Sequence, residues 1–136
     1  MEEERGVFHR AFGMHEGALY VASTMAALWG VGQLLATKGA VKGFGELSLD
    51  NRRILTMEWI VESVALISIA AFVVVATAVH SDVTVSSAVN GVAIGTFVAL
   101  AGVSLATGFK VACLPFRLCP VVFLSSAVLI AWGAWW

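Results

Sequence analysis

Residues 54–79 have the sequence ILTMEWIVESVALISIAAFVVVATAV, in which the only charged side chains are Glu58 and Glu62. A membrane-spanning helix needs about 20 mostly apolar residues with few charges. Backbone N–H and C=O groups find no water inside lipid, so a spanning segment must be a helix or a strand of a closed barrel. Because the alternating pattern of a barrel strand is absent, this segment predicts a transmembrane helix.

The rest of the chain repeats this pattern. Of its 136 residues, 60% are hydrophobic and 12% are charged, a composition far from that of a soluble domain. We therefore expect one domain over residues 1–136, an all-α integral membrane protein built as a four-helix transmembrane up-down bundle. A short N-terminal helix over residues 2–15 is expected to lie at the membrane surface. The expected spans are residues 17–36, 54–79, 87–109 and 120–136.

Local signals set the expected helix ends. Gly39 is a plausible cap after the first span, because glycine commonly follows the last residue of a helix. The polar residues from Ser48 to Asn51 can cap the second span. Pro120 is well placed as the first helical residue of the fourth span. The tryptophans at 132, 135 and 136 predict an aromatic belt that anchors this span at the membrane surface.

The distribution of Lys and Arg predicts how the chain is oriented. Four spans place both termini on one side of the membrane, and that side carries Arg5 and Arg10. The N-terminus is acidic, unlike that of a signal peptide, so the first span is expected to be retained. Because Lys and Arg are enriched in cytoplasmic loops, we expect both termini to be extracytoplasmic, in the plasma (inner) membrane. The opposite side carries Lys38, Lys42, Arg52, Arg53, Lys110 and Arg117.

Two carboxylates open the second span. Glu58 and Glu62 are one helical turn apart on the same face, and Glu62 lies roughly 12 Å along the axis from Ile54. A carboxylate inside the hydrocarbon indicates a functional site, here one that binds and releases a proton or a ligand. The alternative is a structural ion pair with Lys110 or Arg117, which we consider the stronger interpretation. Gln33, near the same end of the first span, can join either arrangement.

Histidines and cysteines give weaker signals. His9, His15 and His80 are expected near the same membrane surface and are weak candidates for a metal site, but their spacing matches no metal motif. We expect dispersed interfacial histidines instead. Cys113 and Cys119 form a Cys-x5-Cys pair rather than the Cys-x-x-Cys typical of thiol oxidoreductases, so two inert, reduced cysteines are expected. The sequence identifies no cofactor.

Small residues recur at helical spacing in two spans. Such residues let helix backbones approach closely in membranes. The simpler interpretation is packing inside the bundle, and the alternative is that one of these faces docks a partner protein or a second copy. The first face comprises Ala18, Ala22, Ala26 and Gly30, and the second comprises Gly91, Gly95, Ala99 and Gly102.

The sequence excludes several functions and leaves three open. It has no phosphate-binding glycine loop, zinc helix or serine nucleophile elbow, and a net charge of -1 gives no basic face for nucleic acid. The leading hypothesis is a non-enzymatic accessory or interaction subunit that has a membrane protein partner or forms homo-oligomers in the lipid bilayer. The second is a small homo-oligomeric transporter or channel with a proton or cation site at Glu62. The third is a membrane oxidoreductase that uses quinone, haem or the cysteine pair.

Overall fold

The computed structural model describes the backbone of residues 2–79, 81–108, 110–111 and 114–136, with side chains from His15 onward. Within these residues the chain is helical and contains no strand. All four helices are long and apolar enough to cross a membrane, which confirms the predicted four-span all-α class. They are α1 (Glu2–Gly43), α2 (Leu49–Ala78), α3 (Val83–Val103), which continues into the π-helical turn η1 (Ser104–Gly108), and α4 (Leu114–Trp135).

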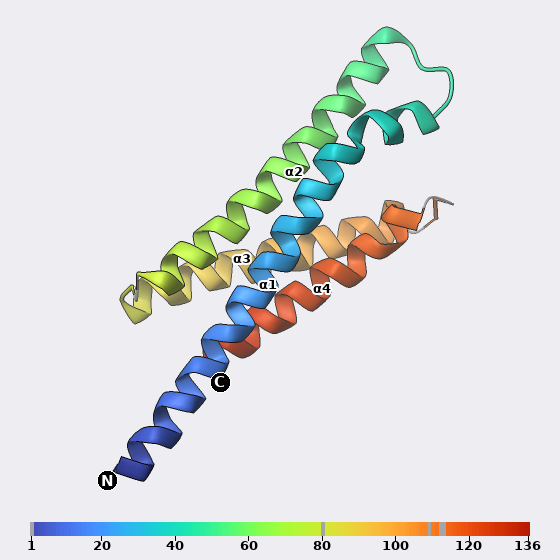
Figure 1. Cartoon of the computed structure of the whole chain (residues 1–136). Helices are drawn as coiled ribbons and strands as arrows, with labels where there is room; N and C mark the ends of the chain where they lie inside the picture. The colour runs from blue at the N-terminus through green and yellow to red at the C-terminus, as the bar shows by residue number, and fades with distance from the viewer. Residues whose placement is uncertain (1, 80, 109, 112–113) are drawn as a thin grey trace.

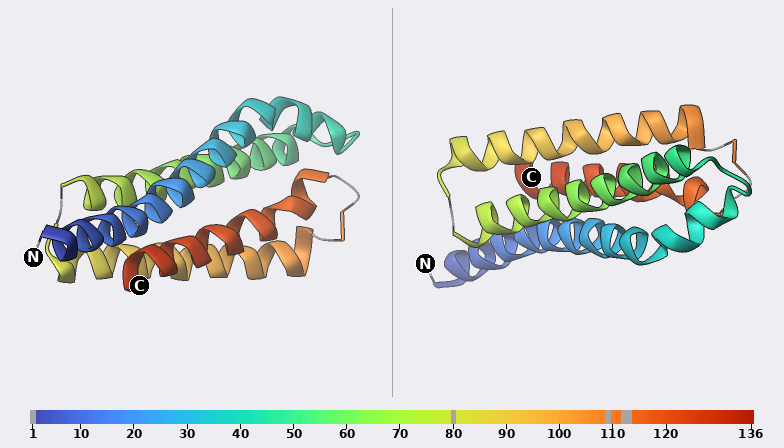
Figure 2. Two further views of the ribbon diagram at one scale, coloured as in Figure 1. Left: turned by 60° about the horizontal axis from the view of Figure 1, so that its bottom comes forward. Right: turned by 90° about the horizontal axis from the view of Figure 1, so that it is seen from above.

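The helices form two antiparallel hairpins, α1 with α2 and α3 with α4 (Figure 1). α1 packs against both α2 and α4, while α2 and α3 share a smaller contact. Both termini lie toward the same end of the bundle. From that end the two hairpins diverge, so that the C-terminal half of α1 and the first turns of α4 are splayed apart (Figure 2).

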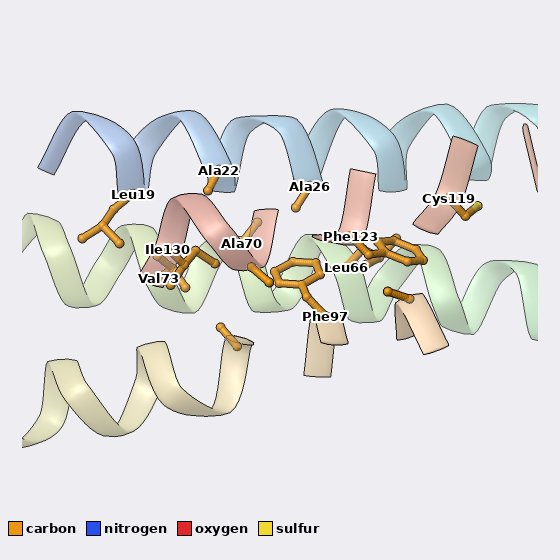
Figure 3. Close-up of a cluster of buried hydrophobic side chains, with 13 residues drawn as sticks. Leu19, Ala22, Ala26, Leu66, Ala70, Val73, Phe97, Cys119, Phe123 and Ile130 are labelled. Carbon is orange, nitrogen blue, oxygen red and sulfur yellow. The ribbon is translucent and has the colours of Figure 1, made fainter. Parts of the chain in front are cut away.

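The core is an apolar cluster near the middle of the bundle (Figure 3). Ala22 and Ala26 of α1 bring that helix close to α2, where Leu66 is fully buried. Phe97 of α3 and Phe123 of α4 stack with ring centroids 6.2 Å apart. Lipid tails are as apolar as these side chains, so close packing, rather than removal from water, holds the helices together.

Most of the buried hydroxyl groups are satisfied within their own helices. The side chains of Ser63 and Thr77 donate hydrogen bonds to the carbonyl oxygens of Trp59 and Val73, at 2.6 and 2.8 Å. Thr37 donates to Gln33 in the same way, at 2.9 Å. Because each bond is local, these polar residues do not have to meet a partner on another helix.

Two helix ends differ from their predictions. The predicted surface helix over residues 2–15 and the first span are one continuous helix, α1, because no proline or helix-capping motif separates them. Gly39 is not a cap but an interior residue, since α1 continues to Gly43. The residue that adopts the left-handed conformation after the helix is Gly45, with φ of 77°. The predicted cap of α2 is confirmed, as the Ser48 hydroxyl accepts the Asn51 N–H at 3.2 Å.

The third and fourth helices both begin earlier than expected. Asp82 caps α3 by accepting the Thr84 N–H at 2.9 Å, so α3 starts at Val83 rather than near Ser87. α4 starts at Leu114, and Pro120 lies inside it rather than at its first position. Pro115 is compatible with the first turn, where backbone N–H groups have no intrahelical partner. Pro120 has no N–H to bond the carbonyl of Phe116, but α4 continues through it.

Candidate intramembrane site

Glu62 lies on α2, half-buried, and faces α1 and α4. Its carboxyl group forms a hydrogen-bonding interaction with the side chain of Gln33 on α1. Glu58, one turn earlier on α2, and Cys119 of α4 are close enough to interact with it electrostatically. Glu62 therefore lies where α2 packs against α1, within electrostatic range of α4, rather than on a purely lipid-facing surface.

The structure brings Glu58, Glu62 and Gln33 together, as the sequence allowed. The Glu62 carboxyl interacts with the side chain of Gln33 and with the charge of Glu58. Lys110 is exposed beyond the end of η1, and Arg117 occupies the first turns of α4. An ion pair between Glu62 and Lys110 or Arg117 stays a prediction.

A groove of about 1020 Å³ opens beside this cluster, where the two hairpins diverge. The C-terminal half of α1 supplies most of its lining, including Trp29, Gly32 and Gln33. Trp59 of α2 and Phe116 of α4 supply aromatic lining from the other helices. Because these residues lie on spanning helices, the groove offers an apolar binding volume at membrane depth.

Aromatic rings line the groove at its end nearest Gly45. The rings of Trp59 and Phe116 meet edge to face with centroids 5.4 Å apart and an interplanar angle of 84°. Phe44 packs against Phe116 in the same manner at 6.2 Å. Edge-to-face contacts of this kind favour one ring orientation, so the three side chains give this end of the groove a defined shape.

Two side chains at the groove bury polar atoms. The side chain of Gln33 is only 9% exposed, yet its carbonyl oxygen Oε1 accepts no hydrogen bond. The indole Nε1 of Trp29 is also buried, and the Trp29 side chain forms a hydrogen-bonding interaction with the thiol of Cys119. An unpaired polar atom in a nonaqueous interior is costly, so a hydrogen-bond donor beside Oε1 of Gln33 would be stabilising.

Sequence reasoning identified Gln33, Glu58 and Glu62 but missed Trp29, Trp59 and Phe116. Trp29 precedes Gln33 by four residues, and this spacing places both on one helix face. That signal was available in the sequence. The contribution of Phe116 was not, because it depends on α4 beginning at Leu114.

Only some of the candidate histidines and cysteines belong to the part of the chain that the structure describes. The side chain of His9, the whole of His80 and Cys113 lie outside the described residues. His15 is half-buried, and its Nδ1 has no hydrogen-bond partner. The described residues contain no group of three His, Cys, Asp or Glu side chains able to hold a metal ion. Cys119 is a buried free thiol, which adds nothing to the oxidoreductase hypothesis.

The two faces of small residues lie in different environments. On α1, Ala22, Ala26 and Gly30 are buried, and a Cβ atom at Gly30 would lie 2.9 Å from the carbonyl oxygen of Ser63 on α2. This face packs inside the bundle. On α3 the small residues point outward, and no atom lies within 4 Å of a Cβ added at any of the three glycines. We call this outward set the α3 face; it comprises Gly91, Gly95, Ala99 and Gly102.

Comparison with known proteins finds no matching family model, no similar curated protein and no similar solved structure. The assignment of function therefore depends on the chemistry of the site. A half-buried carboxyl group on a spanning helix can bind and release a proton or a cation. The neighbouring groove can hold an apolar molecule.

Proposed function

We propose that Glu62 is the proton- or cation-binding site of a small membrane transporter. The observation that carries the proposal is that this carboxyl group lies half-buried within a spanning helix, beside Gln33 and the second carboxylate Glu58. Ionisable groups at membrane depth are costly and commonly mark proton or ion pathways.

The transporter is proposed to work as a homo-oligomer. Leu66, Phe97 and Phe123 fill the middle of the bundle and are each at most 1% exposed. A pathway through the centre of one chain would have to displace these packed side chains. A route along the surface between two copies needs no such rearrangement, and it can include the half-buried Glu62.

Proton flux into liposomes tests this function. Purified protein is reconstituted with a pH-sensitive dye inside the vesicles, and a potassium gradient with valinomycin supplies the driving potential. Flux is compared between the wild type, the Glu62→Gln variant and protein-free vesicles. A wild type whose flux equals that of protein-free vesicles would remove the transporter proposal.

A second candidate function is an accessory subunit of a membrane assembly, favoured by the α3 face. Three glycines and an alanine on the outside of a spanning helix leave room for another helix backbone to approach closely. Packing within one chain does not use this surface, because Gly91, Gly95 and Gly102 have no neighbouring atoms within 4 Å of their added Cβ positions.

The Gly95→Leu variant is expected to lose most of the partner protein, or of the second copy, that co-purifies with the wild type. A leucine at this position would fill the space that an approaching backbone needs. Co-purification of tagged protein from native membranes measures the effect. Gly17→Leu is the matched control, since Gly17 on α1 has equally open surroundings and should retain the partner. Equal recovery with both variants, or a wild type that is active and monodisperse alone, would contradict this function.

We also propose that the termini face the extracytoplasmic side of the plasma membrane. The support is the excess of Lys and Arg on the side that carries the first and last loops, including Arg52 and Arg53. Alkaline phosphatase fused after Trp136 is expected to be active in a bacterial host, and green fluorescent protein fused there is expected to be dark. The same reporters inserted at Gly45 should give the opposite pattern. The reverse result at both positions would overturn the orientation.

A further inference from the structure

We infer that an exposed face of α2 binds an anionic phospholipid, whose phosphate is held by two arginines and whose acyl chain lies along the apolar residues that follow them. The site is a hollow of about 470 Å³ on the first turns of α2. We call it the α2 hollow; its lining residues are Arg52, Arg53, Thr56, Met57, Ile60 and Val61. This inference goes beyond the proposed function, because lipid binding here requires neither Glu62 nor transport.

Of the described residues that line the α2 hollow, the charged ones are the adjacent arginines Arg52 and Arg53, and both are exposed. A guanidinium group is always positively charged and donates paired hydrogen bonds that match the oxygens of a phosphate. Asp50 and Glu58 do not line the hollow. The hydroxyl of Thr56 donates to the carbonyl oxygen of Arg52 at 2.8 Å, so its proton is already used. Recognition of an anion in this hollow therefore falls to the two guanidinium groups.

The remaining lining of the α2 hollow is suited to a hydrocarbon chain. Met57, Ile60 and Val61 are all exposed on the surface of α2. Their spacing of three and four residues continues the helix face that begins at Arg53. A molecule in the hollow thus meets positive charge at one end and apolar surface along the rest. This combination matches an amphiphile with an anionic head group.

The length of α2 places the two ends of the hollow at the corresponding depths of a bilayer. Its 30 residues make a helix about 45 Å long, whereas the hydrocarbon core is about 30 Å thick. The last turns of α2 are apolar and its arginines lie in the first turns, so the surplus belongs to the N-terminal end. A core that ends near Ala78 begins about 20 residues earlier. Ile60 and Val61 then lie inside the hydrocarbon, and Arg52 and Arg53 lie in the head-group region.

An anionic phospholipid uses both parts of the hollow, whereas related molecules use them less completely. Phosphatidylcholine has the same phosphate, but its trimethylammonium group cancels the negative charge and would lie beside the arginines. A free phosphate ester carries the charge but has no chain to cover the apolar residues. Each basic residue close to anionic lipid contributes about a fivefold preference. The two arginines therefore favour the anionic lipid over the zwitterionic one.

Photolabelling in phosphatidylcholine nanodiscs tests this inference. Two probes, a phosphatidylglycerol and a phosphatidylcholine, carry the same diazirine near the ester end of one acyl chain, and mass spectrometry measures the label on residues 56–61 relative to that on α3. The ratio is expected to be at least about fivefold higher for phosphatidylglycerol. Glycerol 3-phosphate in the buffer should leave it unchanged. Equal ratios for the two probes, or displacement of the lipid probe by glycerol 3-phosphate, would overturn the inference.

Three variants distinguish a defined site from a general attraction between basic residues and anionic lipid. Arg52→Gln and Arg53→Gln each remove one guanidinium group, and each is expected to lower phosphatidylglycerol labelling of residues 56–61 about fivefold. Lys42→Gln is the matched control, because Lys42 is an exposed cation in the last turn of α1 that does not line the hollow. It should label like the wild type. An equal loss in all three variants, or no loss in either arginine variant, would refute the site. If an arginine variant does not fold, the comparison of the two probes on the wild type decides.

Discussion

Liposomes that contain the Glu62→Gln variant are expected to show proton flux no higher than protein-free liposomes. Glutamine has nearly the shape of glutamate and can still hydrogen-bond with Gln33, so the contact between α1 and α2 at this position should persist. It does not bind or release a proton near neutral pH. The substitution therefore removes the ionisable group while leaving the packing of α1 against α2 largely intact, and complete loss of flux is the expected result.

The Glu46→Gln variant provides the matched control. Glu46 is an exposed carboxylate in the loop between α1 and α2, outside the helices. Its replacement makes the same change in charge without touching the site, and it should retain wild-type flux. Wild-type flux in Glu62→Gln would remove Glu62 from the pathway. A loss of flux in both variants would point to net charge rather than to this site.

A second large effect is expected when Gly30 is replaced by valine. A Cβ atom at this position would lie 2.9 Å from the carbonyl oxygen of Ser63, 3.0 Å from Cγ1 of Ile67 and 3.2 Å from Cβ of Leu66. The nearest of these is a backbone atom within α2, which can move only if the two helices separate. Overpacking of this kind costs about 1–3 kcal/mol, and valine should lie at the upper end of that range.

Unfolding in mixed micelles of mild detergent and sodium dodecyl sulfate measures the change in the free energy of unfolding. Gly32→Val is the control, because no atom lies within 4 Å of a Cβ added at Gly32. Both variants exchange a helical glycine of α1 for the same β-branched residue, so differences in helix propensity cancel. Equal destabilisation by the two variants would show that the close approach of α1 and α2 at Gly30 does not limit stability.

Much of the fold could be predicted because the bilayer constrains it so strongly. Apolar runs of sufficient length predicted four helices, and the capping residue Ser48 predicted where α2 begins. The less certain boundaries depended on glycine and proline. Gly39 lies inside α1 and Pro120 lies inside α4, because neighbouring turns and tertiary packing sustain a helix through one unfavourable residue.

The candidate site was only partly predictable. Gln33 and Glu62 lie near the loop ends of two consecutive antiparallel spans, and that topology alone places them at a similar depth in the membrane. Whether Glu62 meets Lys110 or Gln33 depends on the rotation of each helix about its own axis, which short spans of nearly uniform hydrophobicity do not specify. The groove depends on the angle between the hairpins, which also follows from packing and not from composition.

The α3 face illustrates the same limit. Small residues at four-residue spacing occur on both α1 and α3, and the sequence gives no basis for treating them differently. In the structure Gly30 is buried against Ser63, while Gly95 has no neighbour within 4 Å of its added Cβ. Helical spacing therefore predicted two contact surfaces, but only the assembled bundle distinguishes the one it uses from the one it leaves open.

The length of α1 has a mechanical consequence. At 1.5 Å per residue, its 42 residues make a rod about 63 Å long, roughly twice the thickness of the hydrocarbon core of a bilayer. A large part of this rod must lie outside the hydrocarbon, or be strongly inclined within it. The helix continues from Glu2 to Gly43 without a break. A change in the tilt of its N-terminal end is therefore expected to shift the position of Gln33 as well.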